Sequence, residues 1–161
     1  MSIVWAMVPM CMVPTAQTVR EQKYVTTAGI VKFAVGESGR MEFVAAIATS
    51  LPAGRYVLRA KLERDDPDEP NREPSLLGTN IQLRRRPLTG EGVGNILVIR
   101  QGLPVLGGNG HYVVDSPGRD LNDGISIETH FYWVELELQQ ATPATAETRN
   151  SVIGLELHFR P

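Results

Sequence analysis

The stretch RYVLRAKLER, residues 55–64, decides the fold class of this chain. Its apolar and charged residues alternate along most of its length. The apolar positions are Tyr56, Leu58, Ala60 and Leu62, and the charged ones are Arg55, Arg59, Lys61 and Glu63. A period of two residues is that of a β-strand with one buried and one solvated face. The stretch therefore predicts a strand whose inner side contributes to a core.

Shorter runs of the same kind flank this stretch on both sides. We expect strands over residues 30–35, 41–49, 77–86, 95–102, 111–115, 125–140 and 151–159. Turn-forming residues separate them, and no segment shows a convincing helical period. About eight or nine strands favour an all-β, two-sheet antiparallel β-sandwich, most simply a jelly roll. We assign residues 24–161 to this domain and residues 1–23 to an extended apolar N-terminal arm.

The composition limits the classes of function. The chain has 161 residues, which suggests one domain with an appendage. Its formal net charge of -2 gives no electrostatic reason to expect nucleic acid or an anionic membrane as a partner. The single cysteine, Cys11, excludes an internal disulfide and a cysteine-based zinc site within one chain. We expect no cofactor and no membrane span.

The first sixteen residues are strongly apolar. They lack the positive start and the small-residue cleavage site of a signal peptide, so we expect cytoplasmic synthesis without cleavage. Two interpretations of this arm stay open. It packs in a groove of its own domain, or it docks onto a neighbouring subunit. In the second case its adaptable contacts are Trp5, Met7, Met10 and Met12.

The stretch THFYWVELELQQ, residues 129–140, places aromatic and acidic residues on one face of a strand. Alternation predicts that one set of side chains faces the core: His130, Tyr132, Val134, Leu136 and Leu138. It predicts that a second set faces outward: Phe131, Trp133, Glu135 and Glu137. Large aromatic side chains on an outer face are costly in water and are common where proteins meet. We favour a subunit contact through Phe131 and Trp133. Cover by a loop or by the arm, and a platform for a sugar ring, are the alternatives.

The closing stretch SVIGLELHF, residues 151–159, also alternates. It predicts a last strand of the domain. We expect Ile153, Leu155, Leu157 and Phe159 to face inward, and Glu156 and His158 to face outward.

A basic triplet, Arg84, Arg85 and Arg86, ends the strand predicted over residues 77–86. Arg84 and Arg86 share one face of such a strand, and Arg85 opposes them. The triplet can bind an anionic sugar, a nucleic acid backbone or an acidic loop of a partner, such as residues 65–69 of a neighbouring copy. The alternative is a solvated strand end beside Pro87.

Signals for a metal site are weak. The three histidines, His111, His130 and His158, show no recurring ligand spacing, so a site that adds Asp115 or Glu156 is disfavoured. The acidic segments 65–69 and 120–124 lack the residue order of a calcium loop. We therefore predict no metal ligand.

Signals for catalysis are also weak. No Gly-x-Ser-x-Gly motif is present, and the glycine-rich segments 90–94 and 107–110 precede strands rather than the helix that a phosphate loop needs. Glu135 and Glu137 share one strand face, roughly 7 Å apart at Cα, whereas a glycosidase opposes its carboxylates across a cleft. We predict no catalytic residue.

The order of segments in the chain resembles a known architecture. HYVVDSPG is followed by HFYWVELEL, a polar insertion and GLELHF, and SLPAGRYVLRAKLERDD lies upstream. Over roughly residues 28–160 this is similar to the jelly-roll domains of bacteriophage fibre and head-decoration proteins, and to the C1q and tumour-necrosis-factor folds. The resemblance implies a structural or attachment role, frequently as a trimer. The apolar arm departs from that pattern.

These observations lead to three hypotheses of function. The first is a non-enzymatic structural protein of a virion or cell-surface assembly, a homo-oligomer that also contacts other structural proteins. The second is a carbohydrate- or receptor-binding module that uses residues 104–124 and the Arg84–Arg86 edge. The third is a metal-dependent enzyme of the cupin type, which would need at least three convergent ligands.

Overall fold

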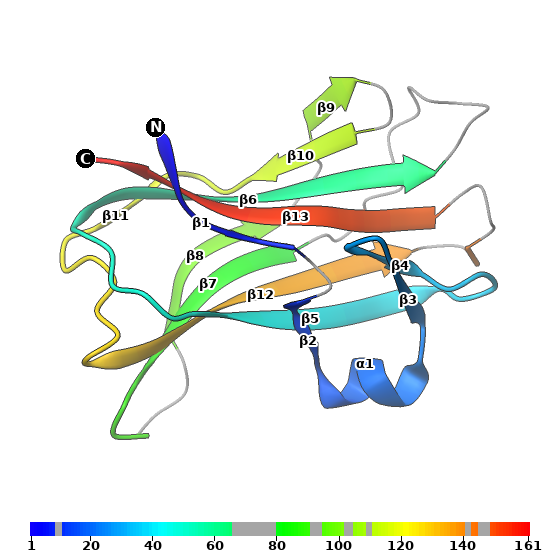
Figure 1. The fold of residues 1–161 in the computed structure, drawn as a ribbon, viewed down its shortest axis with the longest axis horizontal. Helices are drawn as coiled ribbons and strands as arrows, with labels where there is room; N and C mark the ends of the chain where they lie inside the picture. The colour runs from blue at the N-terminus through cyan, green and yellow to red at the C-terminus, as the bar shows by residue number, and fades with distance from the viewer. Residues whose placement is uncertain are drawn as a thin grey trace.

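The computed structural model describes residues 1–8, 11–65, 80–90, 95–101, 105–108, 111–140, 143–144 and 149–161. Its strands form two antiparallel sheets that enclose one apolar core, and the helix α1 (Ala16–Glu21) lies at one edge (Figure 1). This confirms the predicted all-β, two-sheet antiparallel sandwich. Within the described ranges, no helix has the length and hydropathy needed to cross a membrane.

The larger sheet has eight strands in the order β3-β4-β13-β6-β10-β9, with β1 paired to β13 and β11 paired to β6. The bounds of these strands are β1 (Ser2–Met7), β3 (Tyr24–Thr27), β4 (Ile30–Phe33), β6 (Gly54–Asp65), β9 (Val105–Gly108), β10 (His111–Asp115), β11 (Arg119–Leu121) and β13 (Arg149–Arg160). Its centre is the long antiparallel pair of β6 and β13, which runs from Asp65 opposite Arg149 to Arg55 opposite Arg160.

The smaller sheet has five strands in the order β2-β5-β12-β7-β8. The bounds of these strands are β2 (Val13–Pro14), β5 (Gly39–Ile47), β7 (Asn80–Pro87), β8 (Asn95–Gln101) and β12 (His130–Gln140). Strand β12 lies between β5 and β7 and pairs with both over most of its length. It begins at His130, because residues 127–129 form a turn, and Ile125 makes only an isolated bridge to Leu51.

Alternating side chains of both sheets fill the core, as the sequence predicted. On β6, Tyr56, Leu58 and Ala60 are fully buried and Leu62 is nearly so. On β12, the inward positions Tyr132, Val134, Leu136 and Leu138 are buried, and His130 is half-buried at the start of the strand. Period-two patterns locate these residues correctly because each strand has one face on the core.

Strand β13 differs from the predicted alternation at one point. The pairing with β6 shifts between Val152 and Gly154, which is the mark of a β-bulge. The bulge lets Val152 enter the core, where it is fully buried, while Ile153 is only half-buried. The prediction of an inward Ile153 was therefore wrong. Leu155 and Leu157, which follow the bulge, are buried as expected.

The outer face of β13 also differs from expectation. Glu156 and His158 alternate with the core residues, yet each is only 8% exposed. Glu156 forms an ion pair with Lys61, and its other oxygen lies 2.7 Å from Nε2 of His158. The two residues that were expected to face solvent are thus buried in a polar cluster on the sheet surface.

Residues 1–8 and 11–23 lie against the sandwich (Figure 1). Strand β1 pairs with β13 on the larger sheet, and β2 pairs with β5 on the smaller one. Helix α1 begins after Thr15, whose side chain accepts a hydrogen bond from the backbone N–H of Thr18, and ends at Gln22 in the left-handed conformation. The sequence did not predict this helix, because six residues are too few to show a helical period.

Candidate functional site

The outer face of the smaller sheet carries a row of polar and aromatic side chains. On β12 the outward positions are Phe131, Trp133, Glu135 and Glu137, as predicted from alternation. Their direct neighbours on β7 are Arg86, Arg84, Gln82 and Asn80, and three of them face Ala46, Val44 and Glu42 on β5. Three strands thus combine carboxylates, amides, two guanidinium groups and an indole on one surface.

A hollow of about 280 Å³ lies on this surface, and we call it the sheet hollow. Its lining residues come from β5, β7, β12 and the segment before α1; they are Thr15, Glu42, Phe43, Val44, Asn80, Gln82, Arg84, Glu135, Leu136 and Glu137. Trp133 occupies the next outward position on β12 after Glu135. Ala46, its neighbour on β5, is small and exposed, and Trp133 itself is half-buried.

A second hollow of about 240 Å³, the helix hollow, adjoins the sheet hollow at Glu42. Its lining residues are Gln17, Thr18, Glu21, Lys23, Arg40 and Glu42. Glu21 accepts a hydrogen bond from the Gln17 amide at 3.0 Å and lies 2.9 Å from Lys23 Nζ. These two contacts lower the pKa of Glu21 below its ordinary value. Helix α1 therefore adds a charged rim to the sheet surface.

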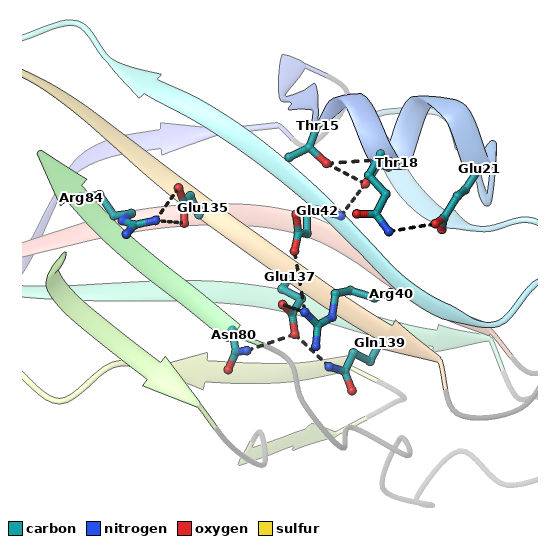
Figure 2. Close-up of polar contacts among 11 residues, drawn as sticks. Thr15, Thr18, Glu21, Arg40, Glu42, Asn80, Arg84, Glu135, Glu137 and Gln139 are labelled. Carbon is teal, nitrogen blue, oxygen red and sulfur yellow. Dashed lines mark hydrogen bonds and ion pairs between the residues drawn. The ribbon is translucent and has the colours of Figure 1, made fainter. Parts of the chain in front are cut away.

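The carboxylate of Glu135 is held by two neighbours. Nη1 of Arg84 donates to both of its oxygens, at 3.1 and 3.0 Å (Figure 2). Nε1 of Trp133 donates to Oε1 at 2.8 Å. The pair with Arg84 joins β7 to β12, and the bond from Trp133 fixes the indole beside the carboxylate. A ligand would thus meet Glu135 and Trp133 already oriented.

The carboxylate of Glu137 is held by three neighbours. Oε1 accepts hydrogen bonds from the Asn80 amide at 3.1 Å and from the Gln139 amide at 2.8 Å. Oε2 lies 3.2 Å from Nη1 of Arg40, which comes from β5 (Figure 2). Three strands therefore fix Glu137, and its side chain is only 14% exposed.

The backbone of Glu42 is held by the segment that precedes and opens α1. Its N–H donates to the hydroxyl of Thr18 at 2.8 Å (Figure 2). Its carbonyl accepts from the N–H of Thr15 at 3.0 Å. Thr18 is buried, at 3% exposure. The Glu42 side chain is 42% exposed and lies 3.9 Å from Arg40, so it remains open to solvent. Thr15, which was assigned to the arm, therefore lines the sheet hollow, and Thr18 lines the helix hollow beside it.

Gln82 lines the hollow, but its Oε1 is buried from solvent and has no hydrogen-bond partner among the described residues. The acceptors that the sheet hollow offers are the carboxylates of its glutamates, beside donors on Asn80 and Arg84.

The structure brings together only some of the residues proposed for partner contacts. Phe131 is 52% exposed, with the Arg86 guanidinium 5.8 Å from its ring centroid, and Trp133 is half-buried. Arg84 lines the sheet hollow, and Arg85 lies on the opposite side of β7, next to Tyr132. Their contacts with a partner stay a prediction.

The arm residues are far more involved with their own domain. Trp5 and Met7 are partly buried against the core, and Met12 belongs to it at 6% exposure. Met10 lies outside the described residues. Of the two interpretations of the arm, packing on its own domain describes β1, β2 and Met12. A role of these residues in binding a partner stays a prediction.

The described residues contain no group of three or more His, Cys, Asp or Glu side chains that could hold a metal ion. His158 is bonded to Glu156, and Asp115 forms two short contacts with Arg59, at 2.6 and 2.7 Å. The side chain of His111, most of the acidic segment 65–69 and the glycines at 92, 94 and 110 lie outside the described residues. The cupin-type hypothesis gains no ligand set from this part of the chain.

Sequence reasoning missed most of the hollow. It singled out Arg84, Glu135 and Glu137 but not Asn80, Gln82, Glu42 or Thr15. One available signal was the stretch NIQLRRR, residues 80–86, in which the outward positions of the first half are amides rather than lysines or glutamates. No local sequence pattern predicts which strands lie on either side of β12.

Comparison with known proteins gives likeness in structure alone. No family model matches the chain, and no curated protein matches it. One similar solved structure is the module TmCBM61 in complex with β-1,4-galactotriose, with 15% identity over 92% of this chain and 87% of that one and a TM-score of 0.39. Another is the CBM36-1 domain of a multidomain xylanase from the hindgut metagenome of Trinervitermes trinervoides, with 11% identity over 98% of both chains and a TM-score of 0.43.

A third similar structure is the enzymatically active domain of tailspike protein 4 of bacteriophage CBA120. It shares 9% identity over 81% of this chain but only 15% of its own, with a TM-score of 0.44. At such scores none of these likenesses carries an argument about ligand or assembly. The resemblance to phage fibre proteins and to the C1q and tumour-necrosis-factor folds is therefore not shown, and a virion role has no support.

Proposed function

We propose that the chain is a carbohydrate-binding β-sandwich module and that the sheet hollow is its binding site. The observation that carries the proposal is an open polar hollow on a sheet face, with oriented carboxylates, amides and an indole along its side. Sugar hydroxyls both donate and accept hydrogen bonds. Glu135 and Glu137 accept, and Asn80 and Arg84 donate, so the hollow can satisfy both roles.

Trp133 supports the same ligand class. Sugar rings have apolar faces that pack on aromatic side chains, and a partly exposed indole beside a polar hollow suits that packing. Fixing of the indole by Glu135 reduces the ordering cost on binding. The site differs from the one expected from sequence, which used residues 104–124 and the Arg84–Arg86 edge. Of those residues, only Arg84 lines the hollow.

The test is a binding survey with matched variants. The wild-type chain should be retarded in gels that contain a polysaccharide, and calorimetry with oligosaccharides of the retarding polymer should give a saturable isotherm. Trp133→Ala and Asn80→Ala should each weaken binding about tenfold or more, which corresponds to about 1.4 kcal/mol. Glu128→Gln, an exposed loop residue outside both hollows, is the control and should bind like the wild type.

The proposal fails if no polysaccharide in a broad survey binds, or if Trp133→Ala and Asn80→Ala bind as well as the control while remaining folded. Circular dichroism and thermal melting of each variant show whether it is folded.

A second candidate function is contact with another subunit, as the sequence suggested. The observation in its favour is Phe131, which remains 52% exposed on the same face as the hollow. Leu88 and Ile127 are also exposed, at 41% and 38%. Exposed aromatic side chains are enriched at protein interfaces. A trimer and other structural proteins as partners remain proposals that follow from the sequence alone.

A further inference from the structure

The charges that line the sheet hollow are unbalanced. Three carboxylates, from Glu42, Glu135 and Glu137, face one guanidinium, from Arg84, which leaves a formal charge of -2. Glu42 lines both hollows, and over the two together the carboxylates of Glu21, Glu42, Glu135 and Glu137 face the cations of Lys23, Arg40 and Arg84, so a formal charge of -1 remains. Negative charge is therefore concentrated where the polar groups of the proposed site converge.

The strand register holds the carboxylates of Glu135 and Glu137 close together on β12. Glu135 and Glu137 are fixed by the contacts described above, and their side chains are only 30% and 14% exposed. Partial burial lowers the local dielectric, so repulsion between these carboxylates and a second anion is stronger than at an open surface. The Arg40 side chain is 58% exposed at the rim, so solvent screens its charge more effectively.

The remaining hydrogen-bonding capacity suits hydroxyl groups. Carboxylates only accept hydrogen bonds, and each has about four lone-pair positions. Oε1 of Glu137 already accepts two bonds, while the Glu42 carboxylate has one long contact, at 3.9 Å from Arg40. A ligand that donates from several hydroxyls satisfies these groups, and a ligand carboxylate does not.

We infer that the site takes an uncharged polysaccharide chain and discriminates against chains that bear uronic acid groups. This inference rests on the proposed function, since it names the ligand class of the same hollow. It also revises the expectation that the Arg84–Arg86 triplet binds an anionic sugar. Arg84 is already paired with Glu135, so its charge is largely compensated within the hollow.

The experiment compares one polymer in two forms. A neutral polysaccharide that binds the wild-type chain is used as such, and again after its primary alcohols have been oxidised to carboxylates. At low salt the oxidised form should bind about tenfold more weakly, and the difference should shrink as salt screens the repulsion. The salt dependence separates repulsion from the loss of a hydroxyl hydrogen bond.

Glu42→Gln tests the source of the discrimination. It removes one negative charge at a side chain of nearly the same shape, and the backbone bonds of Glu42 to Thr15 and Thr18 remain. The ratio of neutral to oxidised binding should fall about threefold in this variant, and it should not change in Glu128→Gln.

Each result has one meaning. If no neutral polysaccharide binds, the proposed function is overturned and the inference falls with it. The inference is wrong, and the proposed function stands, if the neutral polymer binds but its oxidised form binds equally well. The same conclusion follows if the ratio of neutral to oxidised binding changes neither with salt nor in Glu42→Gln.

Discussion

At the scale of single residues, the most unusual feature is the buried acid on the outer face of β13. Glu156 is covered by its neighbours and contacts Lys61 with one oxygen and His158 with the other. Burial raises the pKa of this carboxyl. The hydrogen bonds from Lys61 and His158 lower the pKa, and together with the charges of these two residues they outweigh the effect of burial, so the pKa lies below its ordinary value of 4.5. The folded state thus favours ionised Glu156.

This shift predicts how stability depends on pH. A carboxyl whose pKa is lowered by folding stabilises the native state above its unfolded pKa, and that contribution is lost as pH falls through the folded pKa. Glu156→Gln should remove it and leave one amide oxygen where Lys61 and His158 had a carboxylate oxygen each, at a cost of about 1–3 kcal/mol at neutral pH. Urea unfolding between pH 3 and pH 7 measures both the loss and the flatter pH dependence.

The matched control for this prediction is Glu128→Gln, which changes the same charge at an exposed position. It should leave the free energy of unfolding within about 0.5 kcal/mol of the wild type. A Glu156→Gln chain as stable as this control at neutral pH, with an unchanged acid limb, would contradict the account of the cluster.

At the scale of elements, the N-terminal strands connect the arm to both sheets. Strand β1 extends the larger sheet at β13, while Val4, Trp5 and Met7 pack against the core. Strand β2 and α1 follow the edge of β5 and support Glu42 through Thr15 and Thr18. These two parts of the arm therefore have separable consequences for stability and for the proposed site.

Two truncations test this separation. A chain that begins at Val8 loses β1 and its three apolar contacts, worth about 1 kcal/mol each, so its Tm should fall by roughly 10 °C while glycan binding persists. A chain that begins at Val19 also loses Thr15 and Thr18, which support Glu42 at the sheet hollow, and should lose binding. Thermal melting and calorimetry measure the two effects.

Thr18→Val tests the support that Thr18 gives to Glu42 without removing the arm. It leaves the N–H of Glu42 without its acceptor and should weaken binding several-fold in a chain that still folds. Thr49→Val, at an exposed threonine, is the control. An unchanged Tm in the chain that begins at Val8 would show that β1 adds little to the sandwich and would restore docking on a neighbour as its role.

At the scale of the whole molecule, the two outer faces differ in chemistry. The outer face of the larger sheet pairs its charges internally, through Arg59 with Asp115 and Lys61 with Glu156. The outer face of the smaller sheet holds the hollow and an exposed Phe131. Any partner, whether glycan or protein, is therefore expected on the smaller sheet.

Self-association through this face has a direct test. If Phe131 is a subunit contact, native mass spectrometry should find oligomers of the wild-type chain at micromolar concentration, and Phe131→Ser should shift the distribution toward monomer. Val25→Ser, at a 38% exposed residue on β3 of the other sheet, is the control and should not shift it. A monomeric wild-type chain at all concentrations would exclude this second function.

The sequence by itself determined the sandwich and the faces of its strands. Period-two alternation in residues 55–64 and 130–138 shows which side chains are buried, because each strand has one face on the core. It therefore predicted Phe131, Trp133, Glu135 and Glu137 on an outer face, and Arg84 and Arg86 on one side of β7 opposite Arg85.

Only the tertiary structure decided what those faces do. Alternation gives the face of a residue but not its cross-strand neighbour, since strand order and register depend on pairings between distant segments. The hollow exists because β12 lies between β5 and β7, which brings Glu42 and Asn80 to Glu137. Long-range contacts that local patterns do not encode likewise produce the bulge in β13 and the burial of Glu156. The same holds for the hydrogen bonds of Thr15 and Thr18 to the backbone of Glu42.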